Sequence, residues 1–192
     1  MKNLISVGGQ HQGVFGFPKC PGDSTICQYV AKFLDWGAYT CFVQRYMLSL
    51  LDSKTYQPIF NFSNLVPAQY WHSPLDEETY TKYSQFIARI NCEGGICPSE
   101  YETNLKKLNK MVLIKFNQDT MVVPRESSHF GYYSPGQQTK ISNMTELPVF
   151  TEDRIGLKDM LANDQIDFIS TDGDHLQFTE DFFEKEIVPY LN

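Results

Sequence analysis

Three short apolar runs constrain the fold more than any other feature of this chain. They are "KNLISV" at residues 2–7, "MVLIKF" at 111–116 and "IDFIST" at 166–171, and Gly8-Gly9 ends the first. Strands with so little polar alternation are typical of a parallel sheet that helices cover on both faces. Residues 2–7 should therefore have a neighbouring strand on each side. Because three strands make a small sheet, we expect the chain to lack part of the core that such strands need.

Helical patterns separate the three runs. The sequence predicts helices near residues 25–36, 40–51, 73–90, 99–109, 153–164 and 179–191. The order of elements indicates an α/β fold that contains the C-terminal strands of a parallel sheet. Residues 1–12 and 110–192 would form this partial core, and residues 13–109 a mostly helical insertion.

Three of these helices have recognisable starts. Ser73 and Asp76 fit a capping box, with Pro74 at the first helical position, so the 73–90 helix should begin there. Thr179, followed by acidic residues, fits the N-cap of the last helix. Ser99 and Glu102 repeat the capping-box pattern for the 99–109 helix.

Charge and hydrophobicity exclude some classes of partner. The chain has 192 residues, 42% of them hydrophobic, which predicts one domain with one sizeable core. The net charge is −7 and no basic run occurs, so we expect no nucleic-acid binding. No apolar stretch reaches the roughly 20 residues that cross a bilayer, and the start "MKNLISVGGQ" does not resemble a signal peptide.

Four of the five cysteines fall in two short pairs. Cys20 with Cys27, and Cys92 with Cys97, flank loops rich in Gly, Pro, Ser and Asp, which turn tightly enough for a disulfide. We therefore predict two disulfides, with four reduced thiols as the alternative. Neither pair has the C-x2-C spacing of a zinc site, so we expect no metal. Cys41 is left over, and its surroundings predict a buried thiol on a helix.

Two glycosylation sequons agree with an oxidising compartment. They begin at Asn61 and Asn143. Together with the cysteine pairs they predict a lysosomal or secreted protein. Such an address agrees with the lack of a signal peptide only if the natural protein begins upstream of Met1.

Asp119 and His175 are the strongest candidates for chemistry. Asp119 lies three residues after the second apolar run, and His175 lies just after the third. Functional groups collect at the carboxyl ends of parallel strands, and the order Asp then His matches the last two members of an α/β-hydrolase triad. A buried carboxylate fixes the imidazole tautomer and stabilises the imidazolium that forms. Taken singly, Asp119 also fits a turn residue and His175 an ordinary histidine.

His11 and Gln10 are secondary candidates. His11 follows the first run, so it is an alternative base, but no acidic neighbour orders it. We expect Gln10 and His11 to form a wall of the site or to donate a hydrogen bond there.

The nucleophile is not apparent in the sequence. An α/β hydrolase carries its serine in a Gly-x-Ser-x-Gly turn, and none of the serines of this chain has that setting. Cys41 is a poor substitute, because no strand precedes it.

Four separated blocks resemble one family. "LISVGGQHQGVFGFPKCPG", "YWHSP", "TEDRIGLKDM" and "TDGDHLQFTEDFF" are similar to the C-terminal half of the palmitoyl-protein thioesterases. These are lysosomal α/β hydrolases that remove palmitate from S-acylated cysteines, without a cofactor. The resemblance implies a partial α/β-hydrolase fold, with S-palmitoylated proteins or fatty acyl thioesters as substrates.

The same resemblance assigns individual residues. It makes Asp119 the triad carboxylate, His175 the triad base, and Cys20–Cys27 a family disulfide, and it makes residues 13–109 the insertion that helps to form the acyl groove. A segment near residues 46–64 has no counterpart in the family pattern, and neither does the Cys92–Cys97 pair.

The departures from the family pattern set the expected activity. The serine turn, the oxyanion-hole donors and the signal peptide all belong to the half of the family that this sequence does not match. We therefore expect the chain to be inactive alone. Two alternatives stay open: a non-catalytic protein, either an acyl-binding decoy or an unstable fragment, and a related lipase or esterase.

Overall fold

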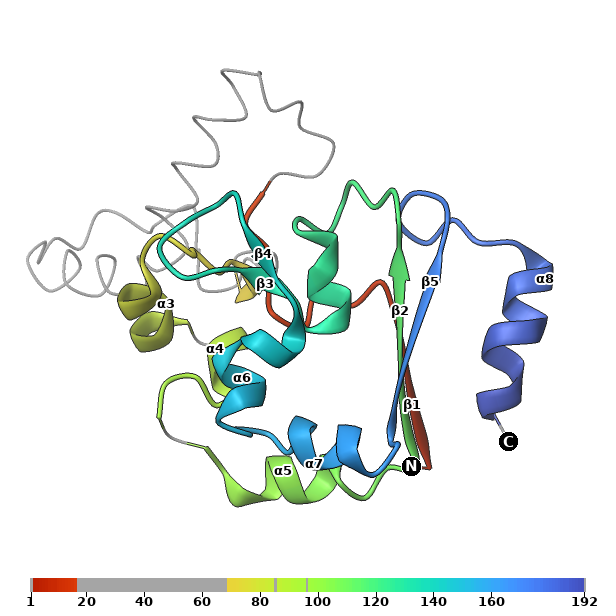
Figure 1. The fold of residues 1–192 in the computed structure, drawn as a ribbon, viewed down its shortest axis with the longest axis horizontal. Coiled ribbons are helices and arrows are strands. Elements are labelled where there is room, and N and C mark those ends of the chain that lie inside the picture. Colours follow the sequence, from red (N-terminus) through yellow and green to blue (C-terminus); the bar gives the residue numbers. More distant parts are fainter. Residues whose placement is uncertain (1, 17–68, 85, 96, 192) are drawn as a thin grey trace, which may run out of the picture.

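A three-stranded parallel sheet forms the centre of the molecule. The structure is a computed structural model that describes residues 2–16, 69–84, 86–95 and 97–191. The strands are β1 (Asn3–Val7), β2 (Lys110–Phe116) and β5 (Ile166–Thr171), and they pair in the order β1-β2-β5 (Figure 1). All three predicted strands are confirmed, each within one residue of its predicted bounds.

β2 is the strand that is buried on both faces. Val112 and Ile114 point to one face and pack with Ile187, whereas Met111 and Leu113 point to the other and join the largest apolar cluster. Burial of alternate side chains on opposite faces explains why the β2 sequence has no polar alternation.

β1 does not meet the prediction of a neighbour on each side. Among the described residues it pairs with β2 alone, and each of its five residues is partly exposed. The central position belongs to β2, between β1 and β5.

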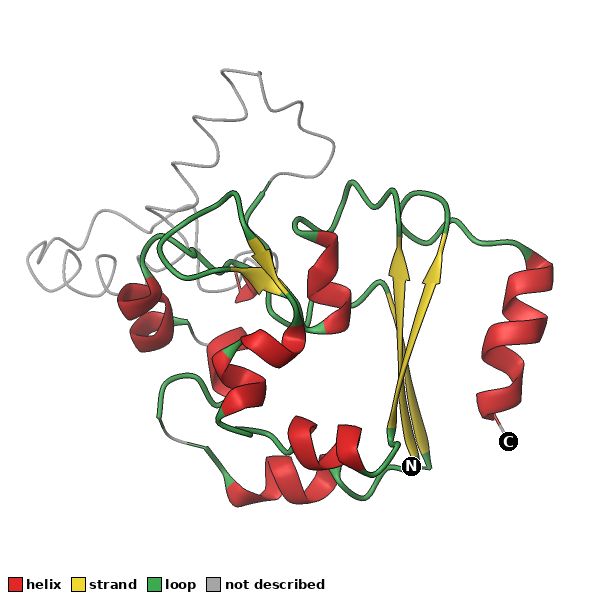
Figure 2. Cartoon of the chain, viewed as in Figure 1, coloured by secondary structure: helices red, strands yellow, loops and turns green. Residues whose placement is uncertain are grey.

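Helices cover both faces of the sheet, as Figure 2 shows. On one side lies the C-terminal helical segment, in which α8 (Glu180–Phe182) continues as a π-helical turn η5 (Phe183–Ile187) and a 3-10 turn η6 (Val188–Leu191). The remaining helices lie on the other side; they are α3 (Glu77–Tyr83), α4 (Ile87–Ile90), α5 (Ser99–Leu105), α6 (Pro148–Thr151), α7 (Leu157–Ala162) and the 3-10 helices η3 (Arg125–His129) and η4 (Met144–Glu146). As predicted, the Thr179 hydroxyl caps the last helix by accepting from the backbone N–H of Phe182.

The predicted helix over residues 73–90 is wrong in its start and in its continuity. Asp76, not Ser73, is the N-cap of α3, and its carboxylate accepts from the backbone N–H of Thr79 at 3.0 Å. The chain is extended at Ser84, so α3 ends there and α4 begins separately. The break lets Tyr80 and Ile87, from different helices, pack in one apolar cluster with Trp71.

Further segments differ from the sequence-based expectation. The helix expected over 153–164 is α7, Leu157–Ala162, and the N-cap of α5 is Pro98 rather than Ser99. α5 ends at Leu105 rather than near 109, because the chain turns there and Asn109 donates its backbone N–H to the Lys2 carbonyl. The region after β2, predicted as loops, contains a short antiparallel pair of β3 (Tyr132–Tyr133) and β4 (Ile141–Ser142).

Cys92 and Cys97 form a disulfide with a Cα–Cα distance of 4.9 Å. The other predicted bridge, Cys20–Cys27, lies outside the described residues, as do Cys41, Asn61 and the predicted helices at 25–36 and 40–51. In the described parts of the chain, no helix has both the length and the apolar content that crossing a bilayer requires.

The central position of β2 leads to a stability prediction. Leu113 is fully buried, whereas Leu75 is 50% exposed. We expect Leu113→Ala to lower the free energy of unfolding by about 2–5 kcal/mol, because it leaves a cavity in the core. Leu75→Ala removes the same atoms at the surface and should cost less than about 1 kcal/mol. Urea denaturation of both variants measures this, and equal losses would contradict the assigned core.

Candidate active site

Two loops leave the sheet at the carboxyl ends of neighbouring strands. The first, residues 117–124, follows β2, and the second, residues 172–178, follows β5. The parallel register pairs Phe116 with Thr171, the last residues of the two strands. The loops therefore start at the same level, and side chains a few residues further along come within reach of one another.

Asp119 and His175 meet between these loops. Nδ1 of His175 lies 2.8 Å from Oδ2 of Asp119. The Asp119 side chain is completely buried, and its other oxygen accepts from the backbone N–H groups of Met121 and Val122 at 2.8 Å each. A carboxylate held by these donors accepts the Nδ1 proton, so Nε2 of the neutral imidazole is left as the basic nitrogen.

Gly8 and Phe116 form a close wall beside the His175 ring. Gly8 directly follows β1 with a φ of +64°, and a Cβ atom there would lie 2.9 Å from Cε1 of His175. The ring centroids of Phe116 and His175 are 6.1 Å apart. All three strands thus contribute to holding the imidazole, because Gly8 follows β1, Phe116 ends β2, and His175 follows β5.

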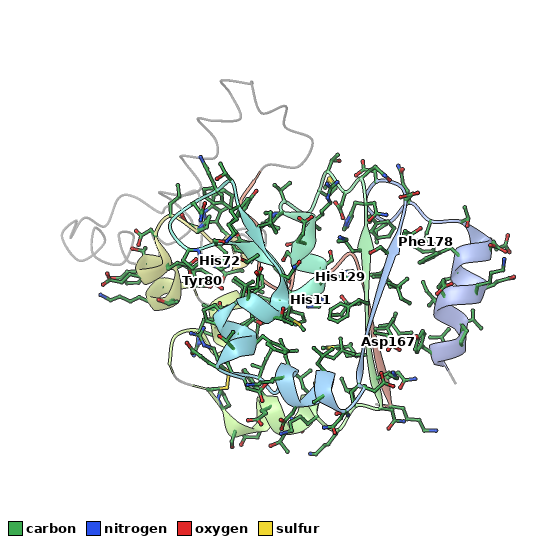
Figure 3. All side chains as sticks on the ribbon, in the orientation of Figure 1. His11, His72, Tyr80, His129, Asp167 and Phe178 are labelled. Atoms are coloured by element: carbon green, nitrogen blue, oxygen red, sulfur yellow. A yellow bond between two sulfur atoms is a disulfide. The ribbon has the colours of Figure 1, made fainter. Side chains whose placement is uncertain are left out.

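His11, the alternative base, has a different environment (Figure 3). Its Nε2 lies 2.8 Å from the Ser6 hydroxyl, and its ring stacks on Phe130 at a centroid distance of 4.6 Å. Burial, with a smaller contribution from the nearby His129, lowers the pKa of His11 from 6.5 to about 4. An uncharged histidine without a carboxylate partner in the described residues matches a structural role better than that of a base. For Gln10, a place in the site wall stays a prediction.

No described side chain hydrogen-bonds to Nε2 of His175. Ser6, the serine of β1, contacts His11 instead. The part of the chain that the structure describes also holds no group of three or more His, Cys, Asp or Glu side chains suited to a metal ion.

A second polar cluster, which the sequence did not reveal, lies under α3. The His72 ring is stacked between Tyr80 and Tyr132, with centroids 3.6 and 4.1 Å away, and its Nε2 lies 3.1 Å from the Glu77 carboxylate (Figure 3). The Tyr80 hydroxyl donates to Glu93, whose pKa is raised, mainly by burial.

This cluster borders a cavity of about 240 Å³. None of the described residues that line the cavity belongs to the two loops that carry Asp119 and His175. The signal for it in the sequence is a histidine next to a tryptophan before a helix, which is equally typical of an ordinary core.

Asn143, the second sequon, is exposed at the N-cap of η4, and its backbone N–H donates to Glu146 at 2.9 Å. An exposed side chain is accessible for modification, and glycosylation of Asn143 stays a prediction.

Comparisons with known proteins all indicate the same family. Residues 1–175 match the family model described as palmitoyl protein thioesterase. The chain is 45% identical over 188 residues to palmitoyl-protein thioesterase 1 of Caenorhabditis elegans, an alignment that covers 98% of this chain and 57% of the relative. It is 30% identical over 194 residues to palmitoyl-protein thioesterase 3 of Dictyostelium discoideum, covering 98% of the chain and 59% of the relative.

A third relative carries the word lysosomal in its name. It is the lysosomal thioesterase PPT2 homolog of Drosophila melanogaster, 32% identical over 127 residues, which cover 64% of this chain and 43% of the relative. The chain thus spans less than two thirds of the length of each of these relatives.

The lowered pKa of His11 predicts a loss of stability in acid. Because the folded-state pKa lies below the unfolded value of 6.5, the unfolded state binds the proton first. His11 therefore contributes full stability above about pH 6.5, and this contribution is lost as the pH falls towards 4. Since the ring is only partly exposed, we expect the free energy of unfolding to fall by on the order of 2 kcal/mol between pH 6.5 and pH 4. His129 acts in the same direction, because burial lowers its pKa as well.

Chemical denaturation at a series of pH values tests this assignment. The curve of unfolding free energy against pH should be flatter for His11→Gln than for the wild type between pH 6.5 and 4, and parallel to it above pH 7. An unchanged acid slope in the variant would show that His11 is not the group responsible.

The close contact at Gly8 leads to a separate prediction. Gly8→Ala should move His175 away from Asp119, because the new Cβ overlaps the imidazole. Gly136→Ala is the matched control, since Gly136 has a φ of +79° and no atom within 4 Å of its Cβ position. Both variants should lose about 1 kcal/mol from backbone strain. Only Gly8→Ala should also lose the downfield NMR signal of the proton on Nδ1, and retention of that signal would contradict the contact.

Proposed function

Because the chain belongs to the palmitoyl protein thioesterase family, we propose that Asp119 and His175 serve the hydrolysis of the thioester that links palmitate to a protein cysteine. The observation that carries this proposal is the 2.8 Å contact between the buried Asp119 carboxylate and Nδ1 of His175. The pair has the position and the order of the last two triad members in an α/β hydrolase.

Each residue has a defined role in the proposed reaction. Nε2 of His175 takes the proton of a serine hydroxyl as the serine oxygen attacks the thioester carbonyl carbon. The carbon–sulfur bond then breaks, and the cysteine sulfur receives the proton from His175. In the second half, His175 takes a proton from water, the hydroxide attacks the acyl-serine ester, and the serine recovers its proton. Asp119 keeps Nδ1 protonated and stabilises the imidazolium in both halves.

The serine is, in this proposal, contributed from outside the 192 residues. None of the serines of this sequence lies in a Gly-x-Ser-x-Gly turn, and the chain spans 57% of its Caenorhabditis elegans relative. The backbone donors of an oxyanion hole would come from the same outside segment.

We assign residues 13–109 to the part that helps to bind the acyl chain. Among the described residues of this range, Trp71, Tyr80 and Ile87 form an apolar cluster with Phe15 packed against it. The compartment we propose is the lysosome, because relatives are named lysosomal thioesterases and the Cys92–Cys97 disulfide suits an oxidising compartment.

Substitution of the pair tests the proposal. The assay uses a peptide with a palmitoylated cysteine, and the enzyme is the product of the longest open reading frame that contains these 192 residues. We expect His175→Ala and Asp119→Asn to lower kcat by about 1,000-fold or more, because each removes a triad function. Asp164→Asn, which removes an exposed carboxylate far from the pair, should leave kcat unchanged. Undiminished hydrolysis by His175→Ala would overturn the assignment of the base.

Two further comparisons separate the alternatives. Hydrolysis by the 192-residue chain alone would show that the nucleophile lies within it. A reading frame closed by a stop codon just upstream of Met1, with no hydrolysis, would favour the non-catalytic alternative. Faster cleavage of the matching oxygen ester than of the thioester would favour a lipase or esterase.

A further inference from the structure

The two loops that carry Asp119 and His175 are joined by hydrogen bonds between residues 117–120 and 172–175. The Asn117 side chain donates to Asp172 at 2.9 Å, and the backbone N–H of Gln118 donates to the Gly173 carbonyl at 3.1 Å. Asp119 contacts His175 at the deep end. The carboxylate of Asp174, in the second loop, contacts Thr120 of the first loop.

Three hydrogen bonds end on a single carboxylate oxygen of Asp174. Its Oδ1 accepts from the backbone N–H of Thr120, from the Thr120 hydroxyl and from the backbone N–H of His175, each at 2.8 Å. Its Oδ2 lies 3.0 Å from the same hydroxyl. The carboxylate therefore joins the residue after Asp119 to the residue that carries the imidazole.

These contacts determine the separation of the two functional side chains. Asp119 is fixed within its own loop, because the backbone N–H groups of Met121 and Val122 hold its carboxylate. The backbone N–H of His175 donates to the Asp174 carboxylate of its own loop, and this carboxylate in turn accepts from Thr120 of the first loop. The bonds between Asp174 and Thr120 therefore connect the His175 backbone directly to the residue that follows Asp119.

We propose that Asp174 is a positioning residue of the thioesterase, which clamps the His175 loop to Thr120 so that the imidazole stays in reach of Asp119. This inference rests on the proposed function of the His175 and Asp119 pair. The action of Asp174 is through the backbone of His175, and it touches neither substrate nor reacting atoms.

Substitutions at Asp174 test the clamp, because a positioning role should change kcat much more than KM. Asp174→Ala should lower kcat by about 10- to 100-fold with KM changed less than about twofold, because a displacement on the order of 1 Å disturbs the base and not the acyl-binding region. Asp174→Asn keeps an oxygen that can accept the two backbone N–H bonds from Thr120 and His175, so it should retain most of kcat. If kcat of Asp174→Asn is as low as that of Asp174→Ala, the effect of Asp174 does not come from its hydrogen bonds to the two loops.

Thr120 offers a second pair of variants from the other side of the clamp. Thr120→Val keeps the shape of the side chain but removes the hydroxyl that donates to Asp174. It should lower kcat by a smaller factor, about three- to tenfold, and Thr120→Ser should recover most of this loss because serine restores the donor. If the valine and serine variants have the same kcat, the hydroxyl takes no part in the clamp.

Asp172→Ala is the matched control for general loosening of the loops. It removes a carboxylate that also joins the two loops but that contacts Asn117 and Gln118, away from the pair. Its kcat should fall by no more than about twofold. A fall as large as that of Asp174→Ala would overturn the specific role of Asp174.

NMR of the product of the longest open reading frame supplies a readout that needs no hydrolysis. The downfield signal of the Nδ1 proton should be present in the wild type and in Asp172→Ala, and broadened or lost in Asp174→Ala. Loss of kcat in His175→Ala with an unchanged kcat and signal in Asp174→Ala would overturn this inference alone. Full hydrolysis by His175→Ala would instead remove the proposed function on which it rests.

Discussion

The parallel pairing of β2 with β5 is the interaction on which the rest of the structure depends. Its register sets Phe116 beside Thr171, so the chain leaves both strands at one level. Asp119 then follows after three residues and His175 after four, which brings two side chains 56 positions apart in sequence to a distance of 2.8 Å. A register slip of one residue would turn the buried side chains of β2 to the wrong faces and separate this pair, so core packing and site geometry are fixed together.

Much of this arrangement is readable from the sequence, because it follows from local and strongly patterned features. The apolar runs located the strands, and the order of strand, Asp, strand and His pointed to the pair. The Thr179 cap was also predictable, since an N-cap is an interaction within one turn. The central place of β2 was not predictable from the sequence, because contacts between distant segments decide which strand has two neighbours.

The errors have physical causes of the same kind. Ser73 and Asp76 are both plausible caps, and the burial of Ser73 left Asp76 to begin α3. The break after Tyr83 follows from packing around Trp71, which overrides the helical spacing of the residues up to Ile90. The polar cluster around His72 involves Tyr132, a residue 60 positions away, so no local pattern could indicate it. The Asp174 clamp is similar, because its partner Thr120 lies in another loop.

His72 ties three distant segments into one body. Its Nδ1 lies 2.7 Å from the Gln12 carbonyl, its own carbonyl accepts from the Tyr132 hydroxyl, and its ring fills the space between Tyr132 and Tyr80 of α3. A rigid-body swing of α3 away from the hydrolase core would have to pull this imidazole out of an aromatic sandwich and leave a buried carbonyl unpaired. α3 is therefore anchored to the residues around Gln12 and Tyr132, and any displacement of this helix would first have to break the contacts of His72.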